Sequence, residues 1–305
     1  MSVFTLITRH QLQALLDAER LTLSRFVPAS EGIENSNYFV SAVDAGYQPR
    51  ELVLTILENV TTEAAQWYHA LLMALGSKSL PVPVPLGGLQ HFDGKPVMLA
   101  PRLNGKHLEK PGQKQAYAIG QLLAQLHNSG FDLPSPAPNE RQQLARLASF
   151  CPLLPKQWQA PAQQLLNDWQ ATQGKTCLIH GDLFRDNTLF IGNQLTGVLD
   201  FYHACHDLPI YDMAVALNDW ALTEQAACLP GVTDAILDGY VSLAPLPTPD
   251  LLPKALAVAA LRFWLSRLAA SQSSKHSLLG RGSKPPDEFA KKFQLRWQQL
   301  AHNTI

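Results

Sequence analysis

One stretch restricts the possible folds of this chain more than any other: residues 180–201, HGDLFRDNTLFIGNQLTGVLDF. Four residues separate Asp182 from Asn187 near its start, and Asp200 stands near its end. Two apolar runs lie between them and are joined by Gly192-Asn193-Gln194. Apolar runs joined by a short Gly/Asn turn are typical of a β-hairpin. The hairpin is expected to bring Asp200 back beside Asn187.

The residue types in this stretch suit phosphoryl transfer. In kinase catalytic loops an Asp accepts a hydroxyl proton, and an Asn at this same spacing holds Mg²⁺. The reaction depends chiefly on positioning and charge neutralisation, and Mg²⁺ prefers oxygen ligands. We therefore expect Asp182 to face the acceptor hydroxyl, and Asn187 and Asp200 to face the metal. A polar turn or a strand end would explain either short motif alone, but the combination favours a kinase.

The composition fits a soluble globular enzyme with room for two lobes. The chain has 305 residues, of which 46% are apolar and 16% charged, and its net charge is −1. Without a basic surplus a nucleic-acid partner is not expected. The longest charge-free run, residues 115–131, is too polar and too short to span a bilayer, and the N-terminus lacks a secretory pattern. We expect a cytoplasmic protein with a small-molecule substrate and no membrane partner.

Cysteine usage agrees with a cytoplasmic location. The four cysteines are widely spaced and contain no C-x-x-C pair, which predicts reduced thiols. Cys205 lies between His203 and His206, so a metal or nucleophile site there is the alternative. The spaced second half of a zinc motif is missing, which favours a plain thiol. The cysteines are Cys151, Cys177, Cys205 and Cys228.

The N-terminal third predicts a small antiparallel sheet. Thr8 can cap a first helix from Arg9 to about Ala18, and the Pro/Val segment 81–85 must run extended. Arg102 to Gly105 is the expected hinge. It divides the chain into a nucleotide-binding lobe, residues 1–102, and a catalytic and substrate-binding lobe, residues 103–305. Predicted strands cover 21–27, 38–43, 51–57 and 97–101, and a second helix covers 62–75.

The segment EGIENSNY, between the first two predicted strands, suits phosphate binding. It has one Gly and several short polar side chains, so its backbone N–H groups can turn towards phosphate oxygens. A plain hairpin turn would look similar. The candidate nucleotide-binding residues are Gly32, Asn35, Ser36 and Asn37 in this loop, Thr55 in a strand, and the backbone near Met98 and Ala100, where kinase-like folds read adenine.

Thr55 occupies the strand position that protein kinases fill with a phosphate-binding Lys. A hydroxyl cannot neutralise phosphate charge as an ammonium does. The counter-charge must therefore come from Mg²⁺ or from another side chain.

Beyond Gly105 the apolar spacing is mostly helical. Asn139 is a predicted helix cap, and Pro161 is predicted to begin a helix. The expected helices cover 114–128, 140–150, 161–171, 210–228, 232–243, 251–271 and 287–301, and the hairpin strands cover 188–191 and 195–199.

With these motifs in hand, the chain resembles the homoserine kinases of the aminoglycoside-phosphotransferase-like family over nearly its whole length. HGD-x-x-x-x-N and LDF are shared with the wider family, whereas GIENSNYFV, LTILE, NDW and RFWLSR narrow the resemblance to homoserine kinases. Thr55 in the Lys position is also similar to this family. The matching segments include MSVFTLIT, LVLTILE, residues 80–85, HGDLFRDN, VLDFYHA, YDMAVALNDW and LRFWLSRL.

The resemblance implies an α+β, two-lobed protein-kinase-like fold, with a small antiparallel-sheet N-lobe and a mostly helical C-lobe. It implies that ATP with Mg²⁺ phosphorylates the side-chain hydroxyl of L-homoserine, giving O-phospho-L-homoserine for threonine biosynthesis. Asp182 would orient and deprotonate the hydroxyl, and Asn187 and Asp200 would hold Mg²⁺. The loop from Gly32 to Asn37 would cover the phosphates. His180 and Arg185 would support the catalytic loop.

Homoserine carries an ammonium and a carboxylate, so its site should offer an acid and an Arg. Arg262 and Arg267 are candidates for the carboxylate, although residues five apart on a helix need not face the same way. The candidates for the ammonium are Asp207, Asp212 and Asp219, of which Asp212 could instead cap a helix.

Two other functions compete with this hypothesis. A kinase of the same fold could phosphorylate an aminoglycoside, choline or another amino alcohol, although the balanced charge gives no sign of an acidic aminoglycoside pocket. Thr55 also allows an inactive nucleotide-binding protein. Inactive kinases tend to lose the base or the metal ligands, and this chain has all three.

Overall fold

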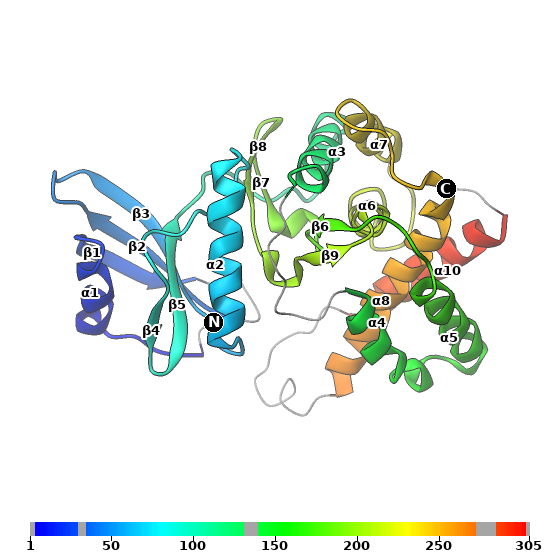
Figure 1. Cartoon of the computed structure of the whole chain (residues 1–305), viewed down its shortest axis with the longest axis horizontal. Helices are drawn as coiled ribbons and strands as arrows, with labels where there is room; N and C mark the ends of the chain where they lie inside the picture. Colours follow the sequence, from blue (N-terminus) through cyan, green and yellow to red (C-terminus); the bar gives the residue numbers. More distant parts are fainter. Residues whose placement is uncertain (1–3, 30–34, 131–139, 273–284, 303–305) are drawn as a thin grey trace. The chain divides into compact units, whose positions relative to one another are not determined.

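The computed structural model describes residues 4–29, 35–130, 140–272 and 285–302 (Figure 1). Its internal contacts divide the chain into two compact units. The first unit is Met1–Gly105 with Thr196–Leu199, and the second is Lys106–Leu195 with Asp200–Ile305. The functional boundary expected between residues 102 and 103 stays a prediction.

The first unit is built on a five-stranded antiparallel sheet with strand order β1-β2-β3-β5-β4. Helices α1 and α2 lie on opposite sides of this sheet (Figure 1). The bounds are β1 Thr22–Pro28, β2 Ser36–Val43, β3 Pro49–Ile56, β4 Gln90–Phe92, β5 Lys95–Pro101, α1 Arg9–Asp17 and α2 Thr62–Ser77.

Side chains alternate across this sheet and give it two different faces. The back face, which includes Tyr38, Leu54 and Leu99, packs in one apolar cluster with Leu12 and Leu16 of α1. Burying each such leucine contributes about 1.5–3 kcal/mol before entropy is counted. The front face carries the residues of the opposite parity, among them Asn37, Phe39, Val53 and Thr55, which are half-buried.

The second unit is mostly helical. None of the described helices combines the length and apolarity that a bilayer crossing needs. The helices are α3 Gln113–His127, α4 Glu140–Ala148, α5 Lys156–Gln170, α6 Pro209–Trp220, α7 Val232–Val241, α8 Leu252–Gln272 and α10 Pro286–His302. Short strand β6, Cys177–Ile179, pairs with β9, Cys205–Asp207. Strand β7, Thr188–Ile191, pairs with β8, Gln194–Val198, as the predicted hairpin, and the last three residues of β8 are assigned to the first unit.

Most of the predicted elements are confirmed, and the predicted cap of α1 is confirmed in detail. The Thr8 hydroxyl accepts from the Gln11 N–H, and the Gln11 side chain accepts from the Thr8 N–H, which forms a capping box. The α+β class is confirmed as well, with the sheet in the first unit and the long helices in the second. The predicted cap Asn139 lies outside the described residues.

Three predictions were wrong at element boundaries. Helix α5 was predicted to begin at Pro161, but it begins at Lys156 and contains Pro161 in its interior. Pro161 has no N–H to donate to the Gln157 carbonyl oxygen, and a helix of this length tolerates the loss of that one hydrogen bond. The helix expected to run to residue 228 ends at Trp220. Strand β4 was missed, although Asp93 and Gly94, both with positive φ, form the kind of turn that links hairpin strands.

Helices α3 and α7 approach so closely that their contact requires glycine. A Cβ added to Gly120 would lie 2.0 Å from the Ile236 carbonyl oxygen, and one added to Gly239 would lie 2.1 Å from the Tyr117 carbonyl oxygen. Because both obstacles are backbone atoms, a larger residue must push one helix away.

We therefore expect Gly120→Ala to lower the free energy of unfolding by about 1–3 kcal/mol. The better helix propensity of Ala offsets this loss by at most about 1 kcal/mol. Urea denaturation checks this prediction. Gly88→Ala is the matched control, because a Cβ there meets nothing within 4 Å. Equal urea midpoints for the two variants would contradict the proposed contact.

Candidate active site

The loop between β6 and β7 brings Asp182 and Asn187 together, and Arg262 of α8 lies close to them. The Asn187 side-chain amide donates to the Asp182 carbonyl oxygen at 2.7 Å and to Asp182 Oδ2 at 3.2 Å. Arg262 Nη1, from α8, lies 3.9 Å from Asp182 Oδ1. The Asp182 side chain is 20% exposed, so a ligand can reach it. Asn187 donates with its amide nitrogen, whereas metal ligation would use the amide oxygen.

A buried carboxylate holds the backbone of this loop from behind. Asp212 of α6 is fully buried and accepts from the His180 N–H (Oδ2, 2.8 Å) and the Gly181 N–H (Oδ1, 2.8 Å). Its Oδ2 also lies 3.1 Å from His127 Nε2 of α3. Burial raises the pKa of Asp212, but the hydrogen bond and charge of His127 and the loop contacts outweigh burial and leave the pKa below its ordinary value. The prediction of Asp212 as an ammonium ligand or helix cap is therefore wrong.

Gly181 and His180 give the loop its shape. Gly181 has φ +75°, and a Cβ there would lie 2.7 Å from the His203 carbonyl oxygen, so other residues would be strained at this position. His180 Nδ1 accepts from the Asp182 N–H at 3.2 Å, and its ring packs on Phe201 with centroids 4.4 Å apart. These contacts support the predicted role of His180 as a brace.

Arg185 is held by the second acid of α6. Asp219 Oδ2 accepts from the Arg185 backbone N–H at 2.8 Å and from its Nε at 3.0 Å. Arg185 Nη1 also donates to the Glu109 carbonyl oxygen at 2.9 Å. This arrangement supports Arg185 as a loop support. It makes Asp219 the partner of Arg185, which leaves it poorly placed to bind an ammonium.

The remaining acceptor-site candidates separate in space. Arg267 donates to Glu288 Oε2 at 2.6 Å and to the Pro285 carbonyl oxygen at 3.0 Å, so it joins α8 to the start of α10. Asp207 is 1% exposed, and its Oδ1 accepts from the Leu208 N–H. Of the two candidate arginines, Arg262 is the one that lies beside Asp182.

Asp200 lies two residues after the end of β8, in a left-handed backbone conformation with φ 65° and ψ 53°. This conformation costs a non-glycine residue about 1 kcal/mol or more. A carboxylate kept at such a position favours a functional role, and its oxygens together with the Asn187 amide oxygen are the ligand types that suit Mg²⁺. Among the described residues no group of three His, Cys, Asp or Glu side chains is placed to hold a metal.

The nucleotide candidates of the first unit lie on different faces of the sheet. On the front face the Thr55 hydroxyl donates to Asn37 Oδ1 at 2.7 Å. Asn35 accepts from the Glu58 N–H at 3.2 Å. Ser36 is fully buried, and its hydroxyl accepts from the Thr5 N–H on the back face, so its side chain does not face a nucleotide on the front. Gly32 lies outside the described residues. Met98 is opposite Thr55 on β5, and Ala100 is opposite Val53.

Sequence reasoning missed Phe39 and Val53, which are paired across β2 and β3 on the front face. Each lies two positions from a predicted nucleotide residue, so strand alternation alone could have found them. The Arg102 guanidinium lies over the Phe39 ring at 4.0 Å from its centroid. The front face therefore offers an aromatic surface with a cation already stacked on it.

His203 was considered only as part of a possible metal cluster. Burial, together with the positive charge of Arg262, lowers the pKa of His203 to about 3. His203 is therefore neutral near pH 7, and the positive charge beside Asp182 comes from Arg262.

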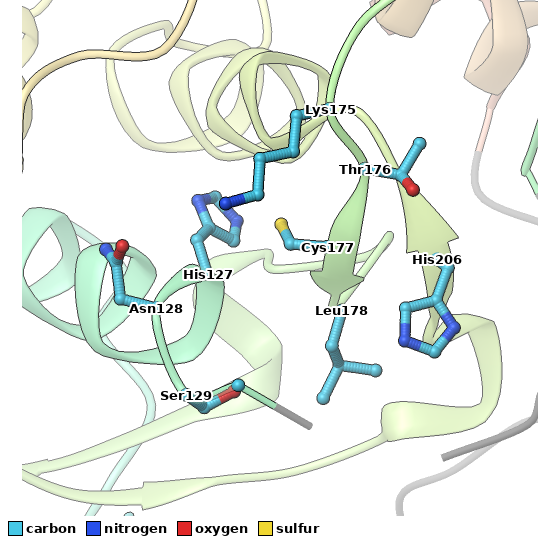
Figure 2. Close-up of a pocket in the computed structure, with 9 residues that line it drawn as sticks. His127, Asn128, Ser129, Lys175, Thr176, Cys177, Leu178 and His206 are labelled. Carbon is cyan, nitrogen blue, oxygen red and sulfur yellow. The ribbon is translucent and has the colours of Figure 1, made fainter. Parts of the chain in front are cut away.

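A cavity of about 430 Å³ lies between the end of α3, at His127, and strand β6, at Cys177 (Figure 2). Figure 2 shows the ammonium end of Lys175 and the thiol of Cys177 directed towards the His127 ring. Burial raises the pKa of Cys177 to about 12, so this thiol stays protonated. None of the predicted catalytic or metal-binding residues lines the cavity. Its lining is His127, Asn128, Ser129, Gly130, Lys175, Thr176, Cys177, Leu178 and His206.

Known proteins resemble this chain in both sequence and structure. The family model described as the phosphotransferase enzyme family matches residues 25–246. A homoserine kinase of Pseudomonas aeruginosa is 35% identical over 289 residues, covering 90% of each chain. A homoserine kinase of Methylobacillus flagellatus is 34% identical over 285 residues, covering 88% of this chain and 87% of that protein.

A solved amicoumacin kinase, in complex with AMP-PNP, Ca²⁺ and Ami, superposes with a TM-score of 0.68 at 14% identity. The superposition covers 96% of this chain and 94% of that one. At this identity the likeness shows the fold alone, and it confirms the predicted protein-kinase-like architecture.

The Asp212 interaction predicts a pH-dependent loss of stability. Asp212→Asn removes a charged acceptor from three N–H groups, so we expect the free energy of unfolding at pH 7 to fall by about 2–4 kcal/mol. The folded-state pKa of Asp212 lies below the ordinary value of a carboxyl group, so the Asp212 contribution is complete above about pH 5 and is lost as the pH falls through the folded-state pKa. Urea denaturation of both proteins between pH 7 and pH 3 measures the difference.

The difference should stay constant from pH 7 to pH 5 and shrink below about pH 4. Asp238→Asn, in an exposed position of α7, is the matched control and should change stability by less than about 0.5 kcal/mol. A difference at pH 3 as large as that at pH 7 would contradict this account of Asp212.

Proposed function

Because this chain belongs to the phosphotransferase enzyme family and, within it, to the homoserine kinases, we propose that it transfers the γ-phosphoryl group of ATP to the hydroxyl of L-homoserine. The product would be O-phospho-L-homoserine, an intermediate of threonine biosynthesis. The observation that carries the proposal is the geometry around Asp182. Its carboxylate accepts a hydrogen bond from the Asn187 amide, and its Oδ1 lies 3.9 Å from Arg262 Nη1. A cytoplasmic location and the absence of nucleic-acid and membrane partners are part of the same proposal.

Asp182 would accept the proton of the acceptor hydroxyl as its oxygen attacks the γ-phosphorus. The bond from that phosphorus to the β–γ bridging oxygen breaks, and ADP leaves with the electron pair. The hydrogen bonds from Asn187 hold the Asp182 carboxylate in one orientation, which keeps the acceptor oxygen in line. Asn187 and Asp200 would hold Mg²⁺, which supplies positive charge to the phosphate oxygens when it is bound.

Arg262 supports an acceptor that carries a carboxylate. It is 4% exposed, and its guanidinium lies 4.0 Å from the Phe263 ring centroid, so its orientation is fixed. Homoserine is short enough to place its hydroxyl at Asp182 and its carboxylate at Arg262. Choline and aminoglycosides are cationic and lack this carboxylate, so a buried guanidinium beside the base would repel them. Arg262 therefore favours homoserine over the alternative acceptors.

An inactive nucleotide-binding protein is the less favoured alternative. Thr55 motivates it, since the Thr55 hydroxyl bonds Asn37 in place of a Lys–phosphate contact. The Asp182–Asn187 geometry argues against it. The buried Asn187 amide orients the Asp182 carboxylate, and a protein without catalytic activity would not need this carboxylate in a fixed orientation.

Asp182→Asn should reduce kcat by about 10²–10⁴-fold, since it removes the proton acceptor and keeps the shape of the side chain. Homoserine-dependent ADP release with Mg²⁺ measures it. Asp186→Asn, an exposed position of the same loop, is the matched control and should keep kcat close to the original value. Turnover of choline or an aminoglycoside, without turnover of homoserine, would refute the proposed acceptor.

Arg262→Met should raise the KM for homoserine by about 10–100-fold, the value of one lost charged hydrogen bond, with little change in the KM for ATP. The acceptor 3-aminopropan-1-ol is homoserine without its carboxylate, so the substitution should not weaken its use further. Arg267→Met should lower stability through Glu288 and leave the KM for homoserine unchanged. Equal effects of Arg262→Met on both acceptors would exclude Arg262 as the carboxylate ligand.

A further inference from the structure

The first unit holds a partly buried ion pair on the back face of its sheet, at the end where β3 finishes. Lys95 Nζ, at the start of β5, donates to Glu58 Oε2 and to Thr5 Oγ1, both at 2.6 Å. The Thr5 hydroxyl donates to the same Glu58 oxygen at 3.0 Å. Glu58 thereby links the N-terminal segment, β3 and β5.

The same carboxylate fixes the residues that end the predicted phosphate loop. The Ser36 hydroxyl donates to Glu58 Oε1 and accepts from the Phe4 N–H at 2.7 Å and the Thr5 N–H at 2.9 Å. The Glu58 N–H donates to Asn35 Oδ1 at 3.2 Å. Asn35 and Ser36 are therefore held by the backbone and by the side chain of one residue.

The pair must stay charged to do this. The Glu58 side chain is 6% exposed, and the Lys95 side chain is 33% exposed. Burial raises the pKa of Glu58, but hydrogen bonds from Lys95, Ser36 and Thr5 outweigh burial and leave the pKa below its ordinary value. Without Lys95 the carboxylate would lose its counter-charge in a poorly solvated place, which is costly and favours rearrangement.

Strand alternation shows that Lys95 does not itself replace the missing phosphate-binding Lys. Lys95 has the parity of Val97 and Leu99, which face the back of the sheet, whereas Thr55 and Asn37 face the front and bond each other at 2.7 Å. Any effect of Lys95 on a nucleotide must therefore pass through the strand that it supports.

We propose that the Glu58–Lys95 pair is a positioning device for the nucleotide phosphates: by fixing Asn35 and Ser36 from the back, it sets where Asn37 stands on the front. It takes over, from the opposite face, the ordering role that a Lys–Glu pair has in protein kinases. This inference rests on the proposed function only in taking ATP as the nucleotide.

The test measures the Kd for a non-hydrolysable ATP analogue with Mg²⁺ by calorimetry on the full chain. Lys95→Met and Glu58→Gln should each weaken binding by about tenfold, because the strand end loses its anchor. Lys95→Arg, which keeps the charge, should restore the Kd to within about threefold of the original. The double variant Lys95→Met with Glu58→Gln should raise the Kd by less than the product of the two single-variant fold-changes, because the two residues act through one interaction.

Arg50→Met is the matched control. It breaks the exposed Arg50–Asp44 pair at the other end of the same sheet, and it should leave the Kd unchanged. A second variant, Thr5→Val, removes one hydroxyl only and should weaken binding less than Lys95→Met does. KM for homoserine at saturating ATP should not change in any of these variants.

Circular dichroism at the calorimetry temperature establishes that each variant is folded. Folded Lys95→Met and Glu58→Gln with the original Kd, whatever their melting temperatures, would overturn the proposal. Because the binding test uses no acceptor, a chain that binds the analogue and fails to phosphorylate homoserine would refute the proposed function and leave the result on the pair intact.

Discussion

The second unit depends on one buried interaction, the carboxylate of Asp212 with the N–H groups of His180 and Gly181. A charged group without water must be compensated by donors, and here the donors are the two amides that directly precede Asp182. His127 Nε2 completes the set and ties α3 to α6. The position of the catalytic loop is thus set by an acid that no substrate touches.

A second acid on the same helix repeats this arrangement. Asp219 follows Asp212 by seven residues, or about two helical turns, so both side chains leave α6 on one side. Asp219 holds Arg185, and Asp212 holds the segment just before Asp182. The loop is therefore fixed at two points on either side of Asp182. This support leaves the Asp182 side chain one-fifth exposed, while the backbone around it has little freedom.

The sequence predicted much of this site, because its motifs are local. The Asp182–Asn187 pair and the hairpin each depend on neighbouring residues, and each is seen in the structure. The roles of Asp212 and Asp219 were not predictable in this way. Charged side chains on helices usually face solvent, and only the tertiary packing of α6 against the loop shows that these two are buried supports. Strands β6 and β9 have three residues each, which is too short for the alternating pattern of a strand to be recognised in the sequence.

A shared fold does not decide the acceptor, since the solved structures with this architecture include an amicoumacin kinase and a choline kinase. The acids of α6 hold the catalytic loop through its backbone N–H groups. These contacts fix the position of Asp182, but they do not select the acceptor. Acceptor choice falls to side chains that reach Asp182 from elsewhere. In this chain α8 supplies Arg262, and His203 nearby is neutral at pH 7. Under the proposed function, the positive charge at that position would separate an amino-acid acceptor from a purely cationic one.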